Sequence, residues 1–230
     1  ASRYGKSQLL AGLVTVIAVI GVVPYIALQL KAVSASLEVL LDHSGASFMP
    51  SMFDSTFVIA ALLAVFTILF GTRHLDATER HEGMVAAIAF ESVVKLLAFL
   101  AVGLFVTYGM FGGFSELFQR AAAAPELARL LQLDSSRSGT WTALILLSGL
   151  AIIFLPRQFQ IIVVENVDEA HLKRAVWLFP LYLVAINIFV LPLALGGLLH
   201  FQGQDFNPDT FVLTLPLARG AESLALLVFI

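Results

Sequence analysis

The chain has 230 residues, of which 59% are hydrophobic and only 13% are charged, and its net charge is −3. Soluble domains usually carry about 25% charged residues, so this composition predicts an integral membrane protein. The small negative charge, without a basic stripe, argues against nucleic acid as a partner. The absence of cysteine excludes a disulfide framework, a zinc finger and a thiolate nucleophile.

Six stretches of the chain are apolar enough to be membrane-spanning helices. A helix needs about 20 apolar residues to cross roughly 30 Å of hydrocarbon, because lipid offers the backbone no hydrogen-bond partners. Such runs are too long and too evenly apolar to be strands of a membrane barrel, so the predicted fold class is all-α. In chain order, the six predicted spans are 7–30, 55–72, 84–111, 140–164, 175–199 and 210–230.

The longest connection between predicted spans, 112–138, has a pattern of its own. Residues 116–132 have the spacing of a short surface helix. Within it, four alanines followed by Pro125 are typical of a helix turn and breaker.

Basic residues in the loops predict the orientation. Short loops rich in Lys and Arg stay preferentially in the cytoplasm. One set of alternate loops is compact and basic, whereas the other spreads its basic residues over longer connections. The compact set holds Arg3, Lys6, Arg73, Arg80, Lys173 and Arg174, and the other set holds Lys31, Arg120, Arg129 and Arg137. We therefore expect Ala1 in the cytoplasm and 112–138 outside.

Both ends of the sequence are expected to be cuts through a longer polypeptide. The first residue is Ala1, and residues 224–230 form an unbroken apolar run. No targeting signal can therefore be sought at the start. We expect the lipid bilayer and the remaining helices of the same domain to be partners of this segment.

Three motifs, in this order along the chain, resemble the sodium/solute symporter family. The first is Arg-Tyr-Gly-Lys-Ser at 3–7, with the span that carries 24–31. The second is the glycine-led turn at 71–82, where Glu79 and Glu82 replace the Asp and the Gln of the family. The third is Leu-Pro-Arg-Gln-Phe-Gln at 155–160, which leads through Glu-Asn at 165–166 to 174–182. The turn at 71–82 is most similar to the symporter-like N-terminal domain of bacterial hybrid sensor histidine kinases.

This resemblance implies a leucine-transporter-like fold of five-plus-five inverted repeats, with a solute site at the midplane beside broken helices. The six spans would be core helices three to eight, so the fold here would be partial. It also implies a small organic solute, sodium as the coupling ion, and the bacterial inner membrane. Arg157 would suit an anionic or amphoteric solute such as an amino acid. No other cofactor and no enzymatic activity are expected in this segment, although a histidine kinase region would lie outside it.

Arg157, Gln158 and Gln160 are candidate solute-binding residues. They follow Pro156 inside an otherwise apolar stretch, where an arginine is costly unless it faces a cavity or a partner. One interpretation is a break in the helix that presents polar groups to a solute carboxylate. The other is a cytoplasmic helix end whose Arg157 reaches the headgroups.

Glu91 and Lys95 are candidates for coupling, because they lie four residues apart inside the third span. That spacing puts them on one helix face, where they can pair. Ionisable residues within a span usually mark a functional pathway. A purely structural ion pair is the alternative.

Two further pairs complete the candidate sites. The resemblance places Thr78 and Glu79 on the cytoplasmic path of the cation, whereas a solvated turn is the alternative. Tyr25 and Gln29, one turn apart, could face a solute, or Tyr25 could anchor the interface. The spacing of 73–82 does not favour a metal site, and no catalytic residue is predicted.

Three functions remain open from the sequence. The first is a cation-coupled carrier that works by alternating access. The second is a receptor that binds a solute and reports it to an attached kinase. The third is a membrane anchor that keeps the fold without transport.

Overall fold

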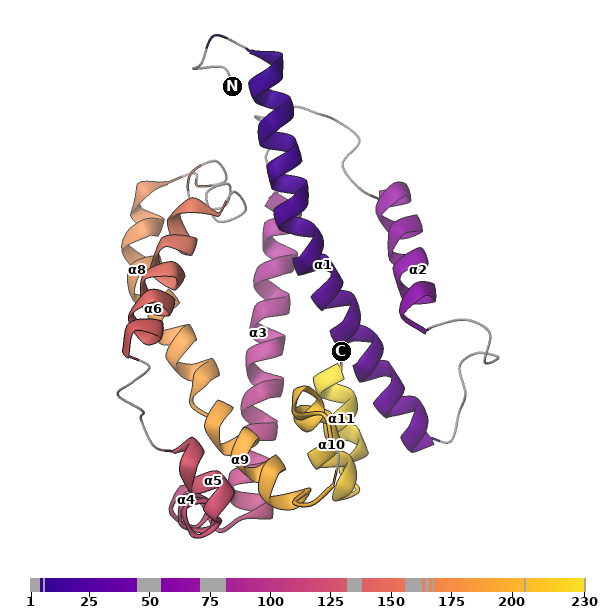
Figure 1. Cartoon of the computed structure of the whole chain (residues 1–230), viewed down its shortest axis with the longest axis vertical. Coiled ribbons are helices and arrows are strands. Elements are labelled where there is room, and N and C mark those ends of the chain that lie inside the picture. Colours follow the sequence, from indigo (N-terminus) through magenta and orange to yellow (C-terminus); the bar gives the residue numbers. More distant parts are fainter. Residues whose placement is uncertain are drawn as a thin grey trace. The chain divides into compact units, whose positions relative to one another are not determined.

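A computed structural model describes residues 5, 7–44, 55–70, 82–131, 138–155, 163, 166, 168–204 and 206–229. In this part of the chain every regular element is a helix, which confirms the all-α prediction. Three helical stretches are long and apolar enough to cross a bilayer: Gln8–His43, Val85–Met110 and Glu169–His200. The helices at Thr56–Leu69 and Ser138–Ala151 are apolar but shorter. The chain divides into two compact units, Ala1–Arg73 and His74–Ile230 (Figure 1).

The first unit contains α1 (Gln8–Ser44) and α2 (Ser55–Phe70). The 37 residues of α1 span about 55 Å at about 1.5 Å per residue. The helix therefore continues past the predicted limit at residue 30, because 31–43 contain neither Gly nor Pro to end it. Where α2 meets α1, the Thr56 hydroxyl donates a hydrogen bond to Ser34 Oγ at 3.1 Å.

The second unit begins with α3 (Glu82–Leu104), whose last turns form the π-helix η1 (Phe105–Met110). Two short helices follow, α4 (Phe114–Ala123) and α5 (Pro125–Leu130). The break at Ala124 confirms the breaker predicted before Pro125. The remaining elements are α6 (Ser138–Phe154), α8 (Glu169–Asn187), α9 (Val190–His200), the short 3-10 helix η4 (Pro208–Thr210), α10 (Phe211–Ala218) and α11 (Glu222–Phe229).

A buried core joins η1 and the end of α3 to α4, α5, α9 and α10, and we call this region the packed end. In Figure 1, α4, α5 and α9 gather around one end of α3. Glycines make room for rings here, since a side chain on Gly103 would overlap Phe189 and one on Gly197 would overlap Phe211. The core consists of Val102, Val106, Phe111, Leu117, Ala121, Leu127, Phe189, Leu193, Leu195, Phe211 and Leu215.

The other part of this unit, the N-terminal half of α3 together with α8, exposes its apolar side chains, and we call it the open end. α8 buries none of its residues, and Trp177 is 80% exposed. A folded chain rarely leaves such a surface uncovered. Lipid would be a suitable cover.

Two predicted spans are interrupted in the structure. The fifth breaks at Ile188 and Phe189, between α8 and α9, because Pro192 has no N–H to donate to the carbonyl of Ile188. Residues 210–230 are not one continuous helix. They turn at Gly220, whose φ of 71° is in the left-handed region that favours glycine.

Candidate functional site

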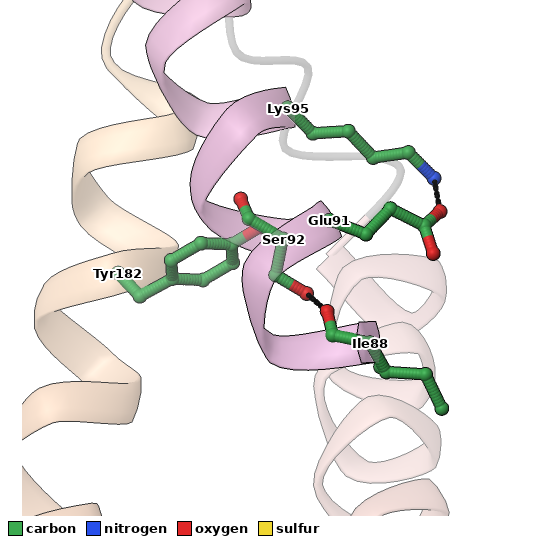
Figure 2. A network of polar contacts seen from close by, with 5 residues as sticks. All are labelled: Ile88, Glu91, Ser92, Lys95 and Tyr182. Carbon is green, nitrogen blue, oxygen red and sulfur yellow. Dashed lines mark hydrogen bonds and ion pairs between the residues drawn. The ribbon is translucent and has the colours of Figure 1, made fainter. Parts of the chain in front are cut away.

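The third predicted span carries a polar cluster on α3, shown in Figure 2. Lys95 Nζ lies 2.5 Å from Glu91 Oε1, so the predicted ion pair is confirmed. Its side chains stay 62% and 56% exposed, for Lys95 and Glu91 respectively. The charges therefore lie on an uncovered face of an apolar helix.

The local sequence explains why the two charges meet. Residues 84–102 contain neither Gly nor Pro, so α3 winds regularly through this stretch. Side chains four residues apart are then neighbours on the helix surface. The ion pair is thus a property of α3 alone and needs no partner helix.

Tyr182 reaches this part of α3 from α8. Its hydroxyl donates a 3.4 Å hydrogen bond to the carbonyl oxygen of Ser92, whose own hydroxyl donates to the carbonyl of Ile88 at 2.8 Å. Figure 2 shows Tyr182 on the opposite side of α3 from Glu91 and Lys95. Tyr182 therefore fixes α8 against the helix that bears the ion pair.

The sequence alone does not single out Tyr182 as a contact residue. It is one of many aromatic residues in the apolar stretches. Its partner is a backbone carbonyl, which every residue has, so the residue type at the partner position gives no signal. Only the packing of α8 on α3 could identify it.

Chemically, the cluster contains one carboxylate and one ammonium group that neutralise each other. A carboxylate and an ammonium inside an apolar span are costly, and they usually face an interior path or a partner. If Lys95 moved away, the Glu91 carboxylate would be able to bind another cation. Among the described residues there is no group of three or more His, Cys, Asp and Glu side chains that could hold a metal ion.

The other predicted site residues are not brought to this cluster. Tyr25 and Gln29 lie one turn apart on α1, as predicted, and both are exposed. They belong to the first unit, and their role in binding a solute stays a prediction. Arg157, Gln158, Gln160, Thr78 and Glu79 lie outside the described residues.

A cavity of about 210 Å³ lies at the packed end of the second unit. Its walls come from the start of α5 and from the region between the end of α9 and the start of α10. The lining residues are Glu126, Leu127, Leu198, Phe201, Gln202, Gly203, Gln204, Phe206 and Phe211. Phe201 stacks on Phe206 with ring centres 4.0 Å apart, which gives one wall an aromatic surface.

No known protein family, no curated protein and no solved structure matches this chain. Similarity to known proteins therefore assigns no family to this chain.

Proposed function

We propose that this chain is part of the membrane domain of a cation-coupled transporter for small organic solutes. Its fold would be the leucine-transporter-like fold of the sodium/solute symporter type, with sodium as the coupling ion. Six spans and a cytoplasmic Ala1 belong to this proposal. Solute uptake could serve an attached signalling kinase.

The Glu91–Lys95 ion pair carries this proposal. It lies within Val85–Met110, one of the three stretches able to cross a bilayer, and its charges are half-exposed. A structural membrane helix gains little from such a pair, since apolar residues would suit lipid better. Charged residues inside a membrane-spanning helix therefore favour a pathway for an ion or a polar solute over a purely structural role. The motifs at 3–31, 71–82 and 155–182 support the same function independently.

A second candidate function is a membrane domain without transport, either a receptor that binds a solute or an anchor of a sensor kinase. Two observations favour it. Glu91 and Lys95 satisfy each other within one helix, so the pair can be purely structural. Glu79 and Glu82 also replace residues that the transporters of the resembled family carry.

Uptake by the complete polypeptide in liposomes distinguishes these functions. Radiolabelled amino acids, sugars and carboxylates would be offered with and without a sodium gradient. Sodium-dependent accumulation of one class supports the transporter, and binding of a solute without accumulation supports the receptor. Neither binding nor uptake across the panel would contradict the transporter and the receptor and leave the anchor.

A variant then tests the ion pair. We expect Glu91→Gln to abolish coupled uptake while leaving the protein inserted in the membrane, because the amide cannot carry the charge. Glu116→Gln is the matched control, since Glu116 forms an ion pair with Arg120 at the same spacing on the surface helix α4. Equal uptake by the two variants would assign Glu91 and Lys95 a structural role.

A further inference from the structure

The last turns of the α3 stretch are wound more widely than an α-helix. The N–H of Phe111 donates to the carbonyl of Val106, five residues back, at 3.2 Å. The N–H of Gly113 donates to the carbonyl of Thr107, six residues back, at 2.9 Å. Residues 105–110 form the π-helix η1, which holds about one residue more per turn than the α-helix. Such turns are rare, and they are frequently found at functional sites.

The hydroxyl of Thr107 is left without a partner in η1. Thr107 is fully buried, and no described atom accepts or donates a hydrogen bond at its Oγ1. Several other helical hydroxyls donate to the carbonyl four residues back, a bond that α winding offers. These bonds are Thr15 to Ala11, Thr67 to Leu63, Ser92 to Ile88, Thr142 to Ser138 and Thr214 to Thr210, at 2.8–3.1 Å.

The winding of η1 also determines where α4 lies. Tyr108, in η1, packs edge-on against Phe114 at the start of α4, with ring centres 6.0 Å apart. Phe114 stacks on Phe189 at 5.6 Å, and Phe189 lies at the break between α8 and α9. A change of winding at Tyr108 would therefore be transmitted to α4 and to this break.

We infer that 105–110 is a two-state segment, π-helical as seen here and α-helical in a second state. In the α-helical state, Thr107 Oγ1 would donate to the carbonyl of Gly103, as the other helical hydroxyls do. Removing the extra residue from the winding rotates the chain after η1 by about 100° and shifts it by about 1.5 Å. Buried Leu117 and Ala121 of α4 favour the π state, whereas the orphaned hydroxyl of Thr107 favours the α state.

The two states differ at the cavity of about 210 Å³. α5 follows α4 directly and supplies Glu126 and Leu127 to one wall, whereas Phe201 and Phe206 on the other wall belong to the connection after α9. Movement of α4 would carry α5 with it and change the width of the cavity. The segment is thus a gate that couples the end of a membrane helix to this cavity.

Distances between spin labels in the full chain, reconstituted in lipid nanodiscs, test the inference. The chain has no native cysteine, so labels at Leu97→Cys on α3 and Gln119→Cys on α4 are specific. We expect two distance populations for this pair. A reference pair at Leu97→Cys and Val184→Cys, on α3 and α8, should give one.

Two variants of Thr107 identify the cause of the second population. Thr107→Val keeps the shape but removes the hydroxyl that only the α state satisfies, so the second population should fall roughly five- to tenfold. Thr107→Ser keeps the hydroxyl and should retain both populations. A single narrow distance before substitution, or a second population unchanged by valine, would overturn the inference.

Amide exchange in the unsubstituted chain gives an independent measurement. The N–H of Gly113 loses its acceptor in the α state, so it should exchange faster than that of Leu100, in the regular part of α3. Equal protection of the two amides would contradict a second state, even if the valine variant failed to fold.

Discussion

The packed end and the open end of the second unit both carry many apolar side chains but bury them very differently. α9 has 11 residues and buries Pro192, Leu193, Leu195, Gly196 and Gly197. α8 has 19 residues and buries none. The difference shows that apolar composition alone does not decide whether a helix packs against protein or offers its side chains to lipid.

Small residues account for much of this difference. Phe189 and Phe211 can enter the packed end because Gly103 and Gly197 have no side chains in the way. On α6 and α1, by contrast, a side chain added at Gly149 or Gly21 would meet nothing within 4 Å. Glycine therefore allows close packing at the packed end, whereas on α6 and α1 no neighbouring side chain needs the space.

The largest expected loss of stability comes from removing a buried side chain from the packed end. Leu117→Ala should lower the free energy of unfolding by about 2–5 kcal/mol, because Leu117 is fully buried and its loss leaves a cavity. Leu130→Ala on neighbouring α5 is the matched control, since Leu130 is 68% exposed. Thermal unfolding in the same detergent would measure both. Equal losses for the two variants would show that the packed end is not a core.

A smaller loss of stability should follow from adding a side chain where the packed end has no room for it. Gly197→Ala puts a methyl group where the Phe211 ring lies, so we expect a loss of about 1–3 kcal/mol in unfolding free energy. Gly149→Ala makes the same change on α6, where it meets no neighbour. Its stability should stay the same or rise slightly, since alanine favours helix. Destabilisation by Gly149→Ala as large as that by Gly197→Ala would remove the distinction between the two environments.

The smallest effect concerns the contact of α8 with α3 at the open end. Tyr182→Phe removes the 3.4 Å hydrogen bond to Ser92, and we expect a loss of about 0.5 kcal/mol because the bond is long. Tyr25→Phe, on exposed α1, is the control and should change less. Unfolding by denaturant, with both variants in one lipid composition, gives the comparison. No difference between them would mean that apolar packing alone holds α8 in place.

Several features of the fold depend on local sequence. Glu91 and Lys95 pair because four residues of a regular helix bring them together, and Pro125 begins α5 because proline cannot continue α4. The first span is predicted to end at residue 30, and the helix α1 continues beyond it to Ser44 for a related reason. The charged residues after residue 30 limit the part of α1 that suits lipid. They do not end the helix, because Lys, Glu and Asp are also found in helices that lie in water.

By itself, the sequence determined an all-helical chain with stretches able to span a membrane, and it located the Glu91–Lys95 pair. Composition and spacing of three to four residues suffice for this, because both act within one helix. Only the tertiary structure decided which apolar faces are buried, that Phe189 packs where Gly103 has no side chain, and that Tyr182 contacts Ser92. It also decided that the Thr107 hydroxyl has no partner among the described residues. These contacts join residues distant in sequence or depend on the winding of one turn, and neither is encoded in a local pattern.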